Sequence, residues 1–191
     1  MRIVGGKWRG RALAGLGKGD PAAHLRPTQD RVRESLFNIL SGGKLGDPVS
    51  GARVLDLFAG TGALGLEALS RGAACAVFVD EGKRALTLLR RNLELFGLKS
   101  EARLLRRDAR RLGPCSEAPF DLVFLDPPYG KALGEQALGA AREDGWIAPD
   151  ALVVWEENSP VTAPEGFELL DSRRYGDTTI SFLRAQPGPH D

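Results

Sequence analysis

The chain has 191 residues, of which 42% are hydrophobic, and a formal net charge of +1 at pH 7. This length and composition predict a single domain with a substantial core. No apolar run reaches membrane-spanning length, and the basic start lacks the apolar stretch of a secretion signal, so we expect neither a membrane nor a secreted protein. Cys75 and Cys115 have no metal-ligand spacing and indicate free thiols in a reducing compartment. We expect a cytoplasmic protein.

The positive charges are concentrated in two parts of the chain. Residues 1–40 contain eight Lys/Arg against three acidic residues, a net charge of +5. A second cluster lies between Arg103 and Arg111 and is interrupted only by Asp108. Such clusters are usually a solvated face, but two of them in a nearly neutral chain favour a polyanionic partner such as RNA. The RNA-binding candidates are Lys7, Trp8, Arg9, Arg11, Arg31, Arg106, Arg107 and Arg110.

Residues 1–25 predict a small basic hairpin or arm ahead of the main domain. Gly5-Gly6 and the glycines of 15–19 are typical turn residues. Trp8 lies between two cations and has two interpretations. It stacks on an exposed base while its neighbours bind phosphates, or it packs the arm against the domain. The sequence leaves both open.

Strands and helices alternate through the middle of the chain. Thr28 fits a helix N-cap ahead of an apolar stripe that ends at Gly42-Gly43. The alternation that follows predicts an α/β fold, a mostly parallel sheet with helices on both faces. The expected strands are 53–58, 74–79, 102–106, 120–125 and 151–156, and the expected helices are 63–71, 83–96 and 131–142.

The pattern changes after residue 160. Segments 166–174 and 178–184 alternate apolar and polar residues around Tyr175-Gly176-Asp177, which predicts an antiparallel hairpin. We therefore expect one α/β domain over residues 26–185. The Pro/Gly-rich residues 186–191 predict a disordered tail.

Residues 120–130, F-D-L-V-F-L-D-P-P-Y-G, predict a buried strand that stops at two prolines. They bring the Asp126 carboxylate, the Pro127 carbonyl and the Tyr129 ring to the carboxyl edge of the sheet, where open α/β folds bind ligands. Asp126 and Pro127 can accept the hydrogens of an exocyclic NH2 group while Tyr129 stacks on its ring. The alternative is an ordinary turn with an N-cap aspartate. The catalytic candidates are Asp126, Pro127, Pro128 and Tyr129.

Residues 60–65, G-T-G-A-L-G, match the G-x-G-x-x-G dinucleotide fingerprint, with Asp80 near its acidic position. Three features favour S-adenosylmethionine over NAD. Asp56 would repel a pyrophosphate but attract the amino group of a methionine moiety. Acidic residues follow three successive strands, and the terminal hairpin is typical of class I methyltransferases. Each acidic residue alone is equally well explained as a helix N-cap or a surface charge.

The cofactor is expected along these strand ends. Asp80 or Glu81 would bind the ribose hydroxyls and Asp108 the adenine amino group, while Arg26 and Thr28 would form a lid. No metal site is expected. The cofactor-binding candidates are Asp56, Phe58, Ala59, Gly60, Thr61, Gly62, Asp80, Glu81, Asp108, Ala109, Arg26 and Thr28.

Four blocks of the sequence carry a family resemblance. They are R-I-V-G-G-K-W-R-G-R near the start, R-P-T-Q-D-R-V-R-E-S-L-F-N at 26–38, D-L-F-A-G-T-G-A-L-G-L-E-A-L-S-R-G-A at 56–73 and D-L-V-F-L-D-P-P-Y at 121–129. The last two are shared with adenine-N6 DNA methyltransferases and other amino methylases. All four together resemble the small, single-domain bacterial 16S ribosomal RNA guanine-N2 methyltransferases.

The resemblance implies a Rossmann-like class I methyltransferase that uses S-adenosylmethionine. Its substrate would be N2 of one guanine in 16S ribosomal RNA, in an assembled or protein-bound small subunit, and such single-domain enzymes are often monomeric. Two alternatives stay open, an adenine-N6 nucleic-acid methyltransferase and a non-catalytic RNA-binding assembly factor. DNA enzymes usually add a recognition domain, and the intact acidic series with D-P-P-Y disfavours a non-catalytic factor.

Overall fold

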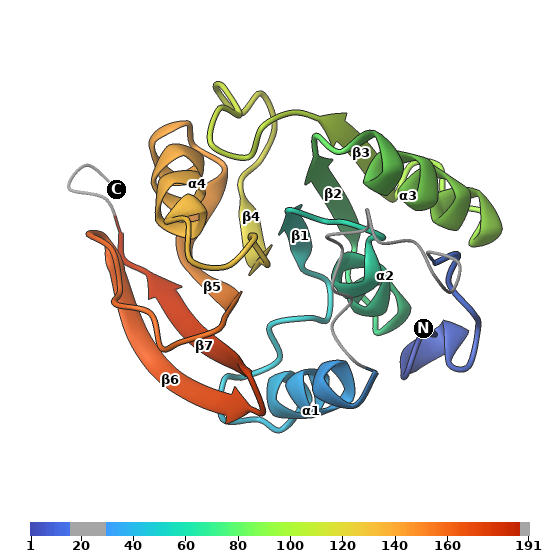
Figure 1. The fold of residues 1–191 in the computed structure, drawn as a ribbon, viewed down its shortest axis with the longest axis horizontal. Coiled ribbons are helices and arrows are strands. Elements are labelled where there is room, and N and C mark those ends of the chain that lie inside the picture. Colours follow the sequence, from blue (N-terminus) through green and yellow to red (C-terminus); the bar gives the residue numbers. More distant parts are fainter. Residues whose placement is uncertain (16–29, 188–191) are drawn as a thin grey trace.

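A seven-stranded β-sheet organises the residues that the computed structural model describes, 1–15 and 30–187 (Figure 1). The strand order is β3-β2-β1-β4-β5-β7-β6. The strands are β1 (Arg53–Leu57), β2 (Cys75–Asp80), β3 (Ala102–Arg106), β4 (Phe120–Leu125), β5 (Ile147–Glu157), β6 (Phe167–Tyr175) and β7 (Thr178–Ala185). The helices are α1 (Asp30–Ser41), α2 (Ala63–Ser70), α3 (Lys83–Leu95) and α4 (Leu133–Glu143), with a 3-10 helix η1 (Gly6–Trp8). Within this described part of the chain, no helix is both long and apolar enough to cross a membrane.

The order in which the chain adds strands to the sheet reverses between β1 and β4. Strands β1 to β5 are parallel to one another, while β7 runs antiparallel to both β5 and β6. After β3 the chain returns to the far side of β1 to form β4, which makes this pair the topological switch point. Open α/β sheets bind ligands beyond the carboxyl ends of the strands at such a point. The predicted mostly parallel sheet with a C-terminal antiparallel hairpin is confirmed.

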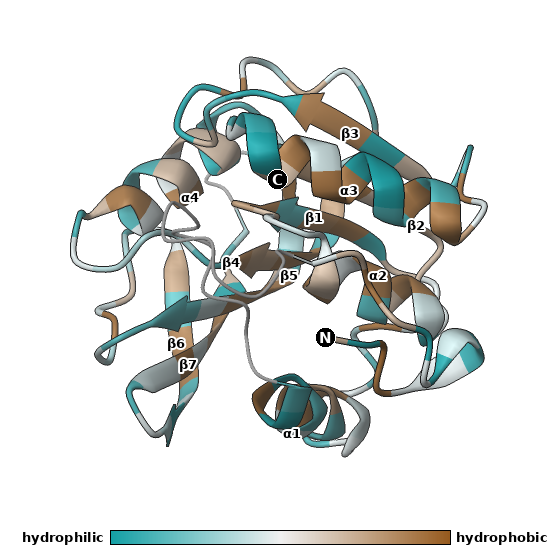
Figure 2. Ribbon diagram, turned by 45° about the vertical axis from the view of Figure 1, so that its right-hand side comes forward, coloured by the Kyte–Doolittle hydropathy of each residue, from teal (hydrophilic) through white to brown (hydrophobic). Residues whose placement is uncertain are grey.

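Apolar side chains cover both faces of the sheet. One core contains Val54, Phe124 and Val154 together with buried residues of α1, α2 and α3. The other contains Leu55, Leu125 and buried residues of α4. Because parallel strands are buried on both faces, their sequences are almost continuously apolar, and Figure 2 shows hydrophobic colour along β1 and β5. Successive strand residues therefore point to opposite cores, which fixes the face on which each following charged residue lies.

The strand expected at 151–156 begins four residues earlier, at Ile147 of β5. Two other expected boundaries were wrong for the same physical reason. The strand expected at 53–58 ends before Phe58, which has a φ of 58°. The helix expected at 131–142 begins at Leu133, because Ala132 has a φ of 52°. A left-handed backbone conformation interrupts regular structure and is uncommon for residues other than glycine. Both residues lie in loops that follow the carboxyl ends of strands.

The N-terminal segment, residues 1–15, folds back on itself and lies beside α2 (Figure 1). The Ile3 N–H donates to the Arg11 carbonyl at 2.9 Å, and Ile3 is fully buried. The Val4 N–H donates to the Glu67 carboxylate of α2 at 2.9 Å. A single antiparallel bridge takes the place of paired strands here. The rest of the hairpin expected over 1–25 lies outside the described residues.

A buried ion cluster joins this segment to α1 and α2. Arg33 of α1 and Glu67 of α2 are both fully buried, with 3.6 Å between Nε and Oε2. Arg71 Nε donates to Glu67 Oε1 at 2.8 Å. Arg33 also donates to Asp30 at 2.8 Å and to the carbonyl of Arg2. A buried charge is costly without its partner, so the cluster holds the three elements in one arrangement.

Candidate active site

The segment after β4 holds the predicted acceptor site. Leu125, the last residue of β4, pairs in register with Trp155 of β5. Asp126 is half-buried, Pro127 is buried and Pro128 is exposed. The two prolines fix the backbone dihedral φ and donate no hydrogen bond. The chain therefore leaves the sheet along a rigid path that holds the Asp126 carboxyl beside the end of β5.

Asp126 is surrounded by other acidic groups. Burial raises the pKa of the Asp126 carboxyl well above its ordinary value of 3.8, and the neighbouring carboxyls of Glu156, Asp56 and Glu157 raise it further. Burial and like charges both disfavour the ionised form of a carboxyl group. A cluster of this kind at a sheet edge is a suitable site for a ligand that donates hydrogen bonds.

Tyr129 is held in place by its hydroxyl group. The hydroxyl donates to Glu156 Oε1 at 2.9 Å and lies 3.3 Å from the hydroxyl oxygen of Thr178. Burial is the largest cause that raises the pKa of the Tyr129 phenol above its ordinary value, so the phenol stays neutral and keeps its proton to donate. Tyr129 thereby connects the segment after β4 with β5 and β7.

Glu156 was missed in the sequence. It is 7% exposed and lies one residue before the end of β5. Leu125 and Trp155 are partners in the β4–β5 register. The residues that follow them in the chain are Asp126, directly after β4, and Glu156 of β5. The available signal was W-E-E, an acidic pair that follows an apolar run, but the strand order that brings β5 beside β4 is not a local property of the sequence.

The glycine turn after β1 is shaped by three residues with positive φ. These are Phe58, Gly60 and Gly62, at 58°, 57° and 79°. Asp80 Oδ2 accepts the Gly60 N–H at 2.9 Å, and Asp80 Oδ1 accepts the Gly82 N–H at 2.8 Å. Asp80, the residue predicted to bind the ribose, therefore also fixes the turn. It can do both because an ionised carboxylate can accept about four hydrogen bonds.

Asp56 lies beneath the first turn of α2. Its Oδ2 accepts the Gly65 N–H at 2.9 Å, and burial raises the pKa of Asp56 to about 8. A Cβ atom at Gly65 would lie 2.4 Å from Cε1 of Phe78 and 3.0 Å from Asp56 Oδ2. The third glycine of the fingerprint is thus required for close packing of α2 on the sheet. A cationic amino group near Asp56 would favour its ionised form.

Asn92 of α3 was also missed, and no local motif marks it. Its side chain is fully buried, and its Nδ2 donates to the Thr61 carbonyl in the glycine turn at 2.8 Å. Its Oδ1 accepts the Ala14 N–H at 2.7 Å, and its Nδ2 lies 3.3 Å from the Ala14 carbonyl. One side chain therefore ties the N-terminal segment to the expected cofactor turn.

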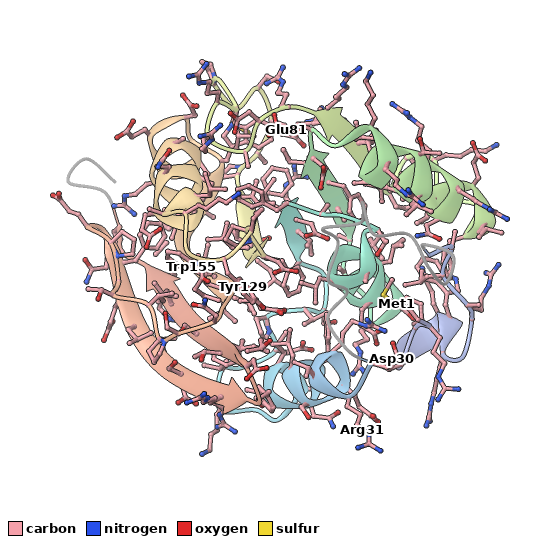
Figure 3. All side chains as sticks on the ribbon, in the orientation of Figure 1. Met1, Asp30, Arg31, Glu81, Tyr129 and Trp155 are labelled. Atoms are coloured by element: carbon pink, nitrogen blue, oxygen red, sulfur yellow. The ribbon has the colours of Figure 1, made fainter. Side chains whose placement is uncertain are left out.

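Two candidates that were assigned to different ligands are paired with each other. Arg110 donates to Asp108 through its backbone N–H at 2.9 Å and through its guanidinium at 2.7 Å. The side-chain hydrogen bond from Arg110 is the largest cause that lowers the pKa of Asp108. Ala109 is buried, and Glu81 is exposed after the end of β2 (Figure 3). Asp108 is thus kept ionised at the edge of the site.

The predicted RNA-binding cations lie at the surface. Trp8 is half-buried, with its ring 4.9 Å from that of Phe96 and with Lys7 Nζ 4.3 Å from its centroid. This packing corresponds to the second of its two interpretations. Arg31 points away from α1 (Figure 3). The exposed candidates are Lys7, Arg9, Arg11, Arg31, Arg106, Arg107 and Arg110. Arg26 and Thr28, the expected lid, lie outside the described residues.

Comparison with known proteins places the chain in a family. The family model described as "Conserved hypothetical protein 95" matches residues 1–184. "Ribosomal RNA small subunit methyltransferase D" of Haemophilus influenzae is 38% identical over 92% of this chain and 89% of its own length, and its Escherichia coli (strain K12) counterpart is 39% identical over 88% and 82%. The solved structure of Escherichia coli yhhF is 35% identical with a TM-score of 0.79, covering 98% of this chain and 99% of that chain. The chain therefore belongs to the Conserved hypothetical protein 95 family, together with ribosomal RNA small subunit methyltransferase D.

Proposed function

We propose that this protein transfers the methyl group of S-adenosylmethionine to the N2 amine of one guanine in small-subunit ribosomal RNA. One observation carries the proposal. The Asp126 carboxyl and the Tyr129 ring follow β4 at the switch point, where the glycine turn after β1 also lies. Relatives with this architecture are named small-subunit ribosomal RNA methyltransferases at 38% and 39% identity.

The residues at the strand ends fit S-adenosylmethionine. Its positively charged amino group suits the buried Asp56 carboxyl, and its ribose hydroxyls suit Asp80, the last residue of β2, or Glu81, which follows it. Asp108 remains the proposed acceptor for the adenine amino group, and the backbone of the glycine turn can approach the ligand closely. Bound there, the sulfonium supplies an electrophilic methyl group.

The acceptor base is proposed to reach the site by flipping out of its stack. Tyr129 would stack on the base, while Asp126 and the Pro127 carbonyl accept the two amine hydrogens. These acceptors would orient the nitrogen lone pair toward the methyl group. A bond between the amine nitrogen and the methyl carbon would then form as the bond between that carbon and the sulfonium sulfur breaks. The carboxyl cluster takes the proton that the amine then loses. Positioning and electrostatics supply the acceleration.

RNA binding is proposed for the exposed cations of the N-terminal segment, α1 and the loop after β3. Such contacts with phosphates position a protein without specifying a base. We therefore propose that the assembled or protein-bound small subunit supplies the target selectivity. We also propose that the protein acts in the cytoplasm, as a monomer, with the lid formed by Arg26 and Thr28.

The proposal is tested by methyl transfer from S-adenosylmethionine to unmethylated small-subunit RNA, both naked and in assembled particles. Nucleoside mass spectrometry identifies the product. N2-methylguanosine supports the proposal, and faster transfer to particles supports the proposed source of selectivity. Formation of N6-methyladenosine would show that the acceptor is the adenine N6 amine rather than the guanine N2 amine. Binding of S-adenosylmethionine without transfer to either RNA would favour a non-catalytic assembly factor.

A further inference from the structure

Glu156 and Asp126 lie side by side on one face of the sheet. Leu125 of β4 and Trp155 of β5 are register partners. Glu156 follows Trp155 within β5, and Asp126 follows Leu125 directly after β4, where its N–H still faces the Leu57 carbonyl of β1 at 3.5 Å. Phe124 and Val154 belong to the core on one face, and Leu125 and Trp155 to the core on the other. Alternation along a strand returns the next residue of each to the first face. Both carboxyls therefore point toward the same site.

The Glu156 carboxylate is oriented before any base arrives. It is 7% exposed, and its Oε1 accepts the Tyr129 hydroxyl at 2.9 Å. The Tyr129 hydroxyl is itself 3.3 Å from the Thr178 hydroxyl oxygen of β7. A carboxylate can accept about four hydrogen bonds, so this contact is compatible with a further donor from a substrate. The ring proposed to stack on the base thus also fixes the carboxylate beside it.

Two neighbouring acceptors select a base edge with two neighbouring donors. Guanine presents N1–H and the N2 amine next to each other. Adenine presents an amine donor next to the N1 acceptor, and cytosine presents an amine donor next to the N3 acceptor. A lone pair that faces a carboxylate is repelled and leaves buried polar groups unpaired, which is costly. The acidic pair therefore fits the guanine edge.

We propose that Glu156 accepts the N1–H of the target guanine while Asp126 and Pro127 hold its N2 amine, so that Glu156 determines the choice of guanine. This proposal rests on the proposed guanine-N2 methylation and names the group that would enforce it. Two adjacent carboxyls repel each other: burial is the main cause of the raised pKa of Asp126, and the Glu156 carboxyl raises that pKa further. Guanine offers a donor group to each carboxyl, its N1–H and its N2 amine, and so relieves that repulsion, whereas adenine offers its amine alone.

The test uses the Glu156→Gln variant and two substrates. At the mapped target position, small-subunit RNA carries either guanosine or 2-aminopurine riboside. The analogue keeps the N2 amine but has an N1 lone pair in place of N1–H. The introduced amide would retain an oxygen for the Tyr129 hydroxyl and gain an N–H that can donate to N1. We expect the guanosine to 2-aminopurine ratio of kcat/KM to fall about tenfold or more, since a site built to hydrogen-bond a group discriminates strongly against its absence.

Glu168→Gln is the matched control. Glu168 is exposed on β6, the edge strand of the sheet, and makes the same change of acid to amide away from the acidic cluster. The control should keep the wild-type ratio. Melting temperature and S-adenosylmethionine affinity are measured for both variants, and both should stay near wild type.

Three outcomes separate this inference from the proposed function. A Glu156→Gln variant with the wild-type ratio overturns the inference while guanine-N2 methylation stands. Wild-type protein that methylates guanosine and 2-aminopurine equally well also overturns it, and this comparison needs no variant. Wild-type protein that forms no N2-methylguanosine overturns the proposed function itself.

Discussion

The side-chain amide of Asn92 donates to the Thr61 carbonyl at 2.8 Å and so connects α3 with the glycine turn after β1. Asn92 also pairs with the backbone of Ala14 through its Oδ1 atom, at 2.7 Å. The expected cofactor turn and the N-terminal segment therefore share one buried side chain. A change at this residue should affect both.

Replacement of Asn92 by alanine should weaken cofactor binding and lower stability. The buried backbone groups of Thr61 and Ala14 would lose their partner, which costs about 1–3 kcal/mol per unsatisfied group. Calorimetric titration with S-adenosylmethionine and thermal unfolding measure the two effects. Asn38→Ala, at an exposed position of α1, should leave both unchanged. Unchanged cofactor affinity in Asn92→Ala would show that the turn does not depend on this contact.

Replacement of Asp126 by alanine should remove turnover and spare cofactor binding. The carboxyl is proposed to hold the acceptor amine, and loss of such a group lowers kcat by roughly 10²–10⁴-fold. Single-turnover methyl transfer and S-adenosylmethionine titration measure the two separately. If affinity for the cofactor falls as far as the rate, Asp126 belongs to the cofactor site instead.

Stability should depend on pH through Asp56. Burial raises its pKa from 3.8 to about 8 in the folded protein, so the folded state retains a proton that the unfolded state has lost. The free energy of unfolding from this group is therefore greatest below pH 3.8 and declines as pH rises to about 8. Urea unfolding at several pH values measures the slope. Asp56→Asn, which keeps an oxygen for the Gly65 N–H, should be at least as stable as the wild type near pH 8 and should show a shallower slope.

Two helical glycines should respond in opposite directions to alanine. At Gly65 the new methyl would lie 2.4 Å from Cε1 of the buried Phe78 ring, and such overpacking costs about 1–3 kcal/mol. At Gly139 of α4, apart from its chain neighbours and the nearby backbone of the helix itself, no described atom lies within 4 Å of the new atom. Alanine should therefore stabilise the protein there by about 0.5–1 kcal/mol, because glycine loses more backbone entropy than alanine when the helix forms. Chemical unfolding compares them, and equal effects would contradict the close packing of α2.

Replacement of Glu67 by alanine should loosen the N-terminal segment. It leaves buried Arg33 without this carboxylate, and breaking a buried pair in this way costs about 3–5 kcal/mol. Hydrogen exchange should rise over residues 1–15 and α1 before it rises in the central strands. Glu34→Ala, at an exposed position of α1, should change stability by less than about 0.5 kcal/mol. Uniform exchange throughout the sheet would contradict a local role for the cluster.

The fold class was predictable because its signals are local. Alternating apolar strands and helices, the glycine turn at 60–62 and the prolines after Leu125 each act within a few residues. Two of the wrong boundaries lie where Phe58 and Ala132 adopt positive φ. Their side chains disfavour that conformation, so no sequence rule for turns would select them. The surrounding structure imposes it.

The sequence by itself determined which chemical groups lie at the carboxyl ends of the strands: the D-P-P-Y segment, the acidic residues at or near the ends of β1, β2 and β3, and the glycines that follow β1. Only the tertiary structure decided which distant residues join them. Glu156 meets Tyr129 across 27 positions, Asn92 meets Thr61 across 31 and Glu67 meets Val4 across 63. Such contacts depend on strand order, register and helix packing, which are settled by burial of the whole core rather than by any short segment.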